Sequence, residues 1–172
     1  MYKRKAIIFD IDGTLANNEH RQHFLVEETK NWEEFFHNMS KDSPIEPIRT
    51  VCASLIANRA MVQSIGFDSS FDVIFCSERP SNYRGATMSW LKRYIYPSDY
   101  IDDIPLYMRT AGDRRPDDVV KEELLERIRK DGYEPFLVFD DRQRVVDMWR
   151  RNGKEKSEAQ AVLGRQDSLP TP

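Results

Sequence analysis

Apolar runs short enough to be strands alternate along the chain with stretches of helical periodicity. Lys5 to Ile11, Phe71 to Ser77 and Pro135 to Phe139 are almost continuously apolar, which is typical of strands buried on both faces of a parallel sheet. Pro105 to Met108 is a shorter candidate strand. Because parallel strands need crossover connections, the alternation predicts an α/β fold with a mostly parallel sheet and right-handed crossovers.

Apolar positions recur at helical spacing between these strands. The first long helix should run from Ile45 or Pro47, since proline favours the first turn, to near Ile65. Three later helices are expected at Ser81 to Tyr94, Pro116 to Lys130 and Gln143 to Arg151. Helices of this kind would cover both faces of the sheet and make three layers.

The end of the chain is more polar than the rest. Beyond Gly153 only Ala161 to Leu163 is a candidate strand, and we expect the residues from Gly164 onward to be disordered. A chain of 172 residues with 40% hydrophobic composition suits one compact domain. We therefore expect a single domain over residues 1–163 and a tail over residues 164–172.

Two of the predicted strands end in a pair of acids. Asp10 and Asp12 follow the first strand, where Gly13 allows a sharp exit, and Asp140 and Asp141 follow the strand that ends at residue 139. In open α/β sheets ligands bind at the carboxyl ends of the strands, so all four carboxylates should meet in one crevice. They would repel one another unless a hard cation neutralised them. Few oxygen ligands with room for water and a phosphate suit Mg²⁺.

Both acid pairs also have a purely structural explanation. Asp12-Gly13 is a common hairpin turn, but residues 16–21 are too polar to be the returning strand. Asp140 or Asp141 could cap the helix that follows, because aspartate is favoured at that position. One of them can do so while the other binds a metal.

Three separated motifs resemble those of the haloacid dehalogenase (HAD) superfamily of phosphotransferases. They are Asp10 to Leu15, Gly112 to Glu123, and Phe139 to Arg151. More narrowly, the last two resemble the phosphatase domain of phage polynucleotide kinase-phosphatases and the free-standing phage phosphatases related to it. The resemblance covers most of residues 5–153. It implies a Rossmann-like fold of HAD type, in which the insertion at about 16–47 is a small helical lid.

The resemblance also implies a mechanism for hydrolysing phosphomonoesters. Asp10 would be the nucleophile that becomes an aspartyl-phosphate, and Asp12 the general acid and base. Lys121 would balance the charge of the transition state. Asp10, Asp12, Asp140 and Asp141 would bind Mg²⁺, with Asp141 acting directly or through water.

The family's second motif corresponds here to the end of the strand at residues 71–77. Ser77 stands where relatives hold a phosphate oxygen, and Arg79 is in register for a further phosphate contact. Relatives often have Gly-Arg after the serine, whereas this chain has Glu78-Arg79. A serine at a strand end is otherwise an ordinary helix cap.

Three other residues are implied in substrate binding. Thr14 would hold the first loop and contact phosphate, and Arg21 matches an arginine that contacts substrate phosphate in the phage phosphatase domains. Asp117 would orient Lys121, four positions on along the same helix face. The alternative for this last pair is a surface ion pair worth ~0.3–0.5 kcal/mol.

The preferred function is a polynucleotide 3′-phosphatase that trims phosphorylated ends to hydroxyls. The substrate would be a phosphorylated polynucleotide end or a nucleotide. The alternatives are a phosphatase of free nucleotides or other small phosphate esters, and a non-catalytic nucleic-acid-binding protein of the same fold. Retention of Asp10, Asp12, Lys121 and Asp140 together argues against the last of these. No Gly-x-x-x-x-Gly-Lys-Ser/Thr motif occurs, so we expect no kinase domain in this chain.

Because the overall charge is slightly negative, any nucleic-acid binding must depend on a local basic patch. The chain has 29 acidic and 26 basic residues and a formal net charge of −3. Basic residues lie near the motifs and could form such a patch, although about half of them are expected to be merely solvated. They are Arg79, Arg84, Lys92, Arg93, Arg109, Arg114, Arg115, Arg142 and Arg144.

Other side chains have less specific interpretations. Cys52 and Cys76 suggest reduced, buried thiols, which favours a cytoplasmic setting in a cell or a phage-infected host, and we expect neither a signal peptide nor a membrane span. The three histidines, His20, His23 and His37, lack metal-binding spacing. In the insertion, the aromatic residues Trp32, Phe35 and Phe36 could stack on a substrate base, but packing is the preferred interpretation.

Overall fold

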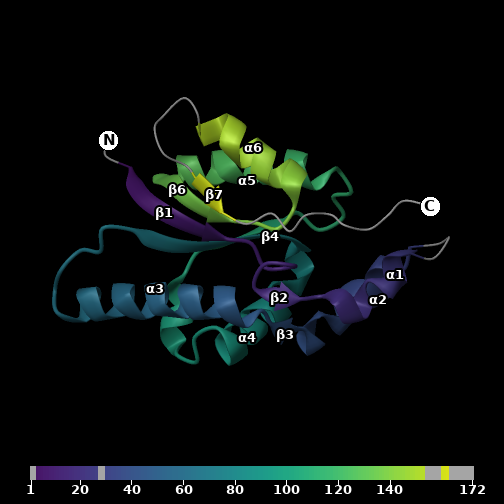
Figure 1. Ribbon diagram of the computed structural model, residues 1–172, viewed down its shortest axis with the longest axis horizontal. Coiled ribbons are helices and arrows are strands. Elements are labelled where there is room, and N and C mark those ends of the chain that lie inside the picture. The colour runs from purple at the N-terminus through teal and green to yellow at the C-terminus, as the bar shows by residue number, and fades with distance from the viewer. Residues whose placement is uncertain (1–2, 27–29, 154–159, 163–172) are drawn as a thin grey trace.

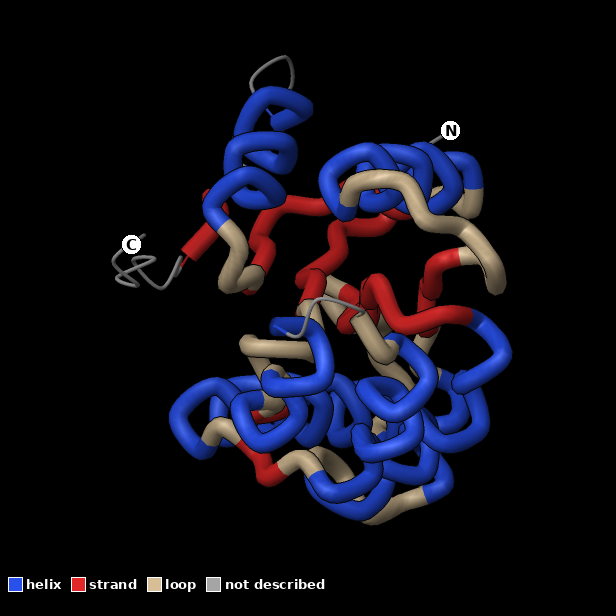
Figure 2. The backbone as a smooth tube through the Cα atoms, turned by 90° about the vertical axis from the view of Figure 1, so that its right-hand side faces the viewer, coloured by secondary structure: helices blue, strands red, loops and turns tan. Residues whose placement is uncertain are grey.

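A computed structural model describes residues 3–26, 30–153 and 160–162 of the chain (Figure 1). Five parallel strands form one sheet in the order β5-β4-β1-β6-β7. Figure 2 shows the strands between two groups of helices, so the predicted three-layer α/β fold is confirmed. The strands are β1 (Arg4–Phe9), β4 (Asp72–Pro80), β5 (Leu106–Arg109), β6 (Tyr133–Phe139) and β7 (Gln160–Val162).

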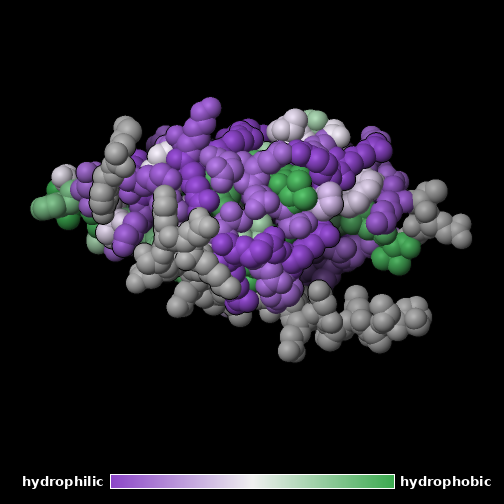
Figure 3. Space-filling model, turned by 90° about the horizontal axis from the view of Figure 1, so that it is seen from above, coloured by the Kyte–Doolittle hydropathy of each residue, from purple (hydrophilic) through white to green (hydrophobic). Residues whose placement is uncertain are grey.

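Helices cover both faces of the sheet (Figure 1). Alternate residues of β1 point to opposite faces, so Ile7 and Phe9 pack with α3 and α4, whereas Ala6 and Ile8 pack with α5 and α6. The face over α5 and α6 is predominantly hydrophilic on its outside (Figure 3). The helices are α3 (Glu46–Ser64), α4 (Arg84–Tyr94), α5 (Asp117–Lys130) and α6 (Gln143–Gly153).

Most element boundaries agree with the sequence pattern, with two local differences. Strand β4 runs three residues past Ser77 because it pairs with β5 through a register shift between Ser77 and Pro80. A 3₁₀ turn at Ser81–Tyr83 then delays the start of α4 to Arg84. The extra residues bring Glu78 and Arg79 into the sheet at its carboxyl edge.

The hairpin interpretation of Asp12-Gly13 is wrong, because β1 pairs with β4 and β6 and not with the chain that follows it. The insertion instead begins and ends in a short antiparallel pair, β2 (Ala16–Asn17) with β3 (Ser43–Pro44). Between them lie short helices at one end of the molecule (Figure 1). These are η1 (Glu19–Arg21), α1 (His23–Val26), α2 (Trp32–His37) and η2 (Asn38–Lys41).

The remaining expectations concern the cysteines, the chain end and the membrane. Cys52 and Cys76 are buried free thiols, as predicted, and burial raises the pKa of both. Strand β7 begins at Gln160 and confirms the last candidate strand for residues 161 and 162, whereas Leu163 and the expected disordered tail lie outside the described residues. Within the described part of the chain, every helix is too short or too polar to cross a bilayer.

Candidate active site

The carboxyl ends of β1 and β6 bring three aspartates together. The backbone N–H of Asp10 donates to the carbonyl of Phe139 at 2.9 Å, which sets the two strand ends side by side. Carboxylate oxygens of Asp10, Asp140 and Asp141 lie within 4.8 Å of one another. Three of the four acids therefore meet at one edge of the sheet, as the position of ligands in open α/β sheets predicts.

Lys121 reaches this cluster from α5. Its Nζ donates to Asp10 Oδ1 at 2.8 Å and to Asp140 Oδ2 at 2.7 Å, and the side chain is fully buried. A third carboxylate, from Glu78, lies 3.3 Å from the same nitrogen. Burial alone would lower the pKa of Lys121, but Asp10 and Asp140 outweigh it and raise that pKa well above its usual value. The lysine therefore carries a positive charge inside the site.

More carboxyl groups meet in this cluster than the single ammonium of Lys121 could balance if all of them were ionised. Burial raises the pKa of Asp10 well above its usual value, against the opposing effect of Lys121. Burial and the neighbouring Asp140 raise the pKa of Asp141 to about 7. Four carboxylates face one ammonium here, counting Glu78. Such a site stabilises a bound divalent cation.

Asp141 fits the metal expectation in a further respect. Its Oδ1 atom is buried and has no hydrogen-bond partner among the described residues. An unpaired buried carboxylate oxygen is costly unless it has a ligand, and a hard cation is the ligand that carboxylates favour. Asp140 also accepts a hydrogen bond from the Arg142 N–H at 3.2 Å, a bond within the turn before α6 and not to the first turn of the helix, so it is not the helix cap that the alternative expected.

Gly13 makes room for Asp141. The φ angle of Gly13 is +85°, and a Cβ atom built there would lie 2.2 Å from Asp141 Oδ2. The glycine therefore does more than permit the turn after Asp12, because its missing side chain is the space that the acid occupies.

The Asp12 carboxylate is not part of the acidic cluster, and its assignment as a metal ligand stays a prediction. One of its oxygens contacts both Arg21 and Arg79, and the other accepts from Arg79 Nε at 3.0 Å. Burial would raise the pKa of Asp12, but Arg79 and Arg21 outweigh it and lower the pKa to about 2. Asp12 also lines the adjacent cavity.

Arg21 and Arg79 are fully buried between two aspartates, Asp12 and Asp42. Asp42 Oδ1 accepts from Arg21 Nε at 2.8 Å, and Asp42 Oδ2 accepts from Arg21 Nη2 at 2.7 Å and Arg79 Nη2 at 2.9 Å. The sequence analysis missed Asp42, since an aspartate before Ser-Pro in a polar insertion gives no signal of burial. His20 also contacts Asp42, at 2.9 Å.

The residues expected to contact phosphate differ in whether they have a donor atom left free. Arg79 Nη1 and Thr14 Oγ1 are buried donors without a hydrogen-bond partner in the described part of the chain. Arg21, by contrast, donates to the two aspartates and to the Phe35 carbonyl. Ser77 is fully buried, and its Oγ accepts the Arg79 N–H at 3.2 Å, as a turn-forming serine does. Among the described residues, two unsatisfied donors thus remain near the loop that follows Asp10.

Asp117 does not orient Lys121, which corrects that expectation. Its carboxylate contacts three guanidinium groups instead, from Arg109, Arg142 and Arg144. The surface ion-pair alternative is wrong as well, because Lys121 bonds to the buried acids. Asp117 therefore holds arginines at the rim of the site. Its spacing of four residues from Lys121 suggested a different partner.

The predicted basic patch forms only in part. Five of its members line a cavity of about 600 Å³ together with Asp12 and Glu78; they are Arg109, Arg114, Arg115, Arg142 and Arg144. The others do not join it. Arg84 donates to the Leu106 carbonyl, Lys92 pairs with Asp99, and Arg79 is buried within the site.

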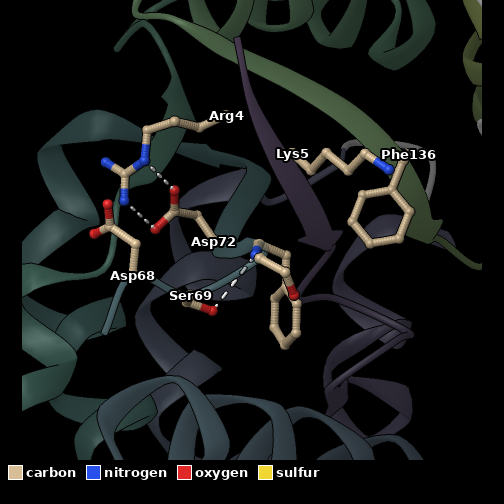
Figure 4. Close-up of a pocket in the computed structure, with 8 residues that line it drawn as sticks. Arg4, Lys5, Asp68, Ser69, Asp72 and Phe136 are labelled. Atoms are coloured by element: carbon tan, nitrogen blue, oxygen red, sulfur yellow. Dashed lines mark hydrogen bonds and ion pairs between the residues drawn. The ribbon is translucent and has the colours of Figure 1, made fainter. Parts of the chain in front are cut away.

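A second cavity, of about 590 Å³, lies at the opposite end of the sheet. Figure 4 shows Arg4 and Asp72 joined in an ion pair in its lining, with Lys5 directed towards Phe136. Asp72 also pairs with Arg59, so its charge is balanced within the protein. Ligands of open α/β sheets bind at the carboxyl ends of strands, and this cavity lies at the amino ends.

A family model described as the polynucleotide kinase PNKP phosphatase domain matches residues 4–160. A protein of Autographa californica nuclear polyhedrosis virus, named as a bifunctional polynucleotide kinase/RNA ligase, is 25% identical over 146 residues. That match covers 85% of this chain and 18% of the relative.

Solved structures give a similar result. A chain of the Pnkp1/Rnl/Hen1 RNA repair complex is 27% identical, with a TM-score of 0.64 over 95% of this chain and 44% of that chain. The class C acid phosphatase from Bacillus anthracis with tungstate bound shares the fold, with a TM-score of 0.58 and 16% identity over 98% of this chain and 69% of that chain. This chain spans less than half the length of the viral relative and of the repair-complex chain.

Proposed function

The chain belongs to the family of the polynucleotide kinase PNKP phosphatase domain and is a phosphoric monoester hydrolase of HAD type; from this premise we propose that it is a Mg²⁺-dependent polynucleotide 3′-phosphatase. Its substrate would be the phosphorylated 3′ end of a nucleic acid. The names of its relatives, which speak of polynucleotide kinase and of RNA repair, support this choice of substrate class.

One observation carries the proposal at the level of atoms. Three buried polar atoms without partners surround the loop that bears Asp10: the hydroxyl of Thr14, Nη1 of Arg79 and Oδ1 of Asp141. The first two are donors, which phosphate oxygens accept, and the third is an acceptor, which a cation binds. These atoms are the donors and the acceptor that a phosphate and a metal ion, bound side by side, would need.

The geometry also supports a role for each charged group in the reaction. Asp10 would attack phosphorus through a carboxylate oxygen, and Lys121 would stabilise the negative charge that develops there. Asp10, Asp140 and Asp141 would hold Mg²⁺, which supplies charge neutralisation of the phosphate when bound.

Asp12 would handle the protons of the reaction. It follows Asp10 by two residues and faces the cavity, so it lies on the side of the leaving group. Its contacts to Arg79 and Arg21 hold its pKa at about 2, so it would gain the proton that it needs only when a bound phosphate takes over the contacts of Arg79. It would then protonate the departing oxygen in the first step and take a proton from water in the second.

The decisive experiment compares phosphate release from four substrates, each with Mg²⁺ and with EDTA. They are a 3′-phosphorylated oligonucleotide, the same oligonucleotide phosphorylated at its 5′ end, and free 3′- and 5′-mononucleotides. We expect Mg²⁺-dependent release that is fastest from the 3′-phosphorylated oligonucleotide. Equal rates from the mononucleotides would favour the small-substrate phosphatase, and equal rates in EDTA would contradict the metal requirement.

A further inference from the structure

The ammonium group of Lys121 contacts three carboxylates of the protein itself. An ammonium has three N–H donors, and two of them donate to Asp10 and Asp140 at 2.8 and 2.7 Å. The third contact of the same nitrogen is the ion pair with Glu78, at 3.3 Å. Glu78 is therefore the partner that lies farthest from the ammonium. A phosphate oxygen that bonds to Lys121 has to take the place of one of these three.

Glu78 is not needed to neutralise Lys121. The carboxylates of Asp10 and Asp140 together can already supply more negative charge than one ammonium carries, and a third carboxylate adds repulsion. In the mechanism proposed above, Asp10 and Asp140 act as nucleophile and metal ligand, so neither can give way to the substrate. Glu78 has no such task, which makes it the partner that a substrate can replace.

Glu78 is also the partner that borders the cavity. The cavity of about 600 Å³ beside Asp12 is lined by Glu78 and not by Asp10, Asp140 or Lys121. The Glu78 side chain is 16% exposed, whereas the side chains of the last three are between 1% and 3% exposed. A ligand that enters from this cavity therefore meets Glu78 before it meets Lys121.

The backbone of Glu78 is fixed, while its side chain has room to move. The Glu78 carbonyl accepts from Arg109 Nε at 3.0 Å, and the N–H of the following residue donates to Ser77 Oγ at 3.2 Å. Trp32 lines the same cavity and is 49% exposed, so this space is open to water. Rotation about the side-chain torsions can therefore carry the carboxylate from Lys121 into the cavity without a change in the backbone.

The cavity also offers new partners to a displaced Glu78 carboxylate. Arg109, Arg142 and Arg144 line it, and these three side chains share the single carboxylate of Asp117. A carboxylate that turns away from the lysine therefore meets guanidinium groups whose charge is only partly balanced. Their attraction lowers the electrostatic cost of the displacement.

We propose that the Glu78 carboxylate occupies the place on Lys121 that a phosphate oxygen of the substrate takes, and that it competes there with substrate and product. The proposal rests on the phosphatase function above and adds how the product leaves. The substrate displaces Glu78 towards the cavity when it binds. After hydrolysis the carboxylate returns to Lys121 as inorganic phosphate departs. Glu78 thus weakens phosphate binding and prevents the product from blocking the site.

Isothermal titration calorimetry with inorganic phosphate in the presence of Mg²⁺ tests the competition without turnover. Glu78→Gln keeps the shape of the side chain and removes its charge, so phosphate should bind about tenfold more tightly than to the wild type. Glu78→Ala removes the acceptor altogether and should have the same effect. Glu126→Gln, at an exposed residue of α5 that pairs with Arg129, removes the same charge and should leave the Kd unchanged. Unchanged or weaker phosphate binding by both Glu78 variants would overturn the proposal.

A third variant separates competition for Lys121 from simple repulsion of phosphate by Glu78. Glu78→Asp keeps the negative charge, but its side chain is one methylene shorter and, on the same fixed backbone, loses the contact with the ammonium. Phosphate should therefore bind to Glu78→Asp more tightly than to the wild type, although the net charge is the same. A wild-type Kd in this variant would show that Glu78 acts through repulsion alone and would overturn the proposal.

Steady-state kinetics with p-nitrophenyl phosphate test the release of product. In Glu78→Gln the KM and the inhibition constant of inorganic phosphate should fall together, by about tenfold each, while kcat does not rise. Progress curves of this variant should level off early as phosphate accumulates, whereas those of the wild type and of Glu126→Gln should stay linear for longer. Equal inhibition of the wild type and Glu78→Gln by phosphate would contradict the role of Glu78 in product release.

These results distinguish the proposal from the function on which it rests. If the wild type hydrolyses no phosphomonoester, the phosphatase function fails, and the Kd values of phosphate still decide the role of Glu78. If the wild type is active but Glu78→Gln binds phosphate with the same Kd, the phosphatase stands and the competition is wrong. Absence of phosphate binding in the wild type and in all the Glu78 variants would also overturn the competition.

Discussion

Asp42 and Arg79 form a buried ion pair, with 2.9 Å between Asp42 Oδ2 and Arg79 Nη2, across a sequence separation of 37 residues. Asp42 comes from the end of the insertion, and Arg79 from strand β4. The same guanidinium contacts Asp12, so the pair connects the insertion to the general acid and base that we propose. The Asp42 side chain is fully buried, which makes its partners essential to its stability.

Asp42→Asn should destabilise the protein by about 3 kcal/mol or more, because it leaves two buried arginines short of one negative charge. The free energy of unfolding from urea denaturation measures this. Activity towards p-nitrophenyl phosphate should fall as well, since Arg21 and Arg79 lose the group that positions them. Asp99→Asn, at an exposed ion pair with Lys92, is the matched control and should change stability by less than about 1 kcal/mol. A stable, fully active Asp42→Asn would show that the buried pair has no such role.

Lys121→Ala should reduce kcat by about 100- to 1000-fold, because a preorganised charge is lost where the transition state becomes negative. Steady-state kinetics in saturating Mg²⁺ measure the effect, and circular dichroism checks that the variant is folded. Lys92→Ala removes a lysine from a surface ion pair and should leave kcat unchanged. A decrease in kcat of less than tenfold for Lys121→Ala would indicate that the lysine has a structural role only.

Mg²⁺ should stabilise the folded protein by binding Asp10, Asp140 and Asp141. At a concentration 100 times the Kd the gain is about 2.7 kcal/mol, or a rise of about 5–10 °C in Tm for a chain of this size. Differential scanning fluorimetry with Mg²⁺ and with EDTA measures it. Asp141→Asn should lose most of the shift, because the unpartnered Oδ1 belongs to that carboxylate. An identical Tm in both buffers would argue against a metal site here.

Gly13→Ala should impair both stability and the response to Mg²⁺. The new methyl group would collide with Asp141 Oδ2, and the φ angle of +85° is unfavourable for alanine. Gly85→Ala is the control, since nothing lies within 4 Å of its added Cβ atom. In helix α4 that change should stabilise the protein by about 0.5–1 kcal/mol. If Gly13→Ala bound Mg²⁺ as the wild type does, the close approach of Gly13 to Asp141 would not be required for metal binding.

The sequence by itself determined the strands, the main helices and the position of the acidic cluster. Strands buried on both faces appear as continuous apolar runs, and the ends of neighbouring parallel strands must meet at one edge of the sheet. For this reason the sequence alone predicts that Asp10, Asp140 and Asp141 lie together at one edge of the sheet. The family motif supplied Lys121 in the same way, as one residue at a fixed place on its helix.

Only the tertiary structure decided which charges pair with which. The contacts of Asp42, of Glu78 and of the arginines that pair with Asp117 are examples. They depend on how the insertion and the loops fold back over the sheet. Local periodicity carries no information on such long-range pairs, and a charged residue in a polar segment looks the same whether it ends in solvent or in a buried network. The exposure of Trp32 was decided in the same way, since the space beside its ring is created by segments about fifty and eighty residues further along the chain.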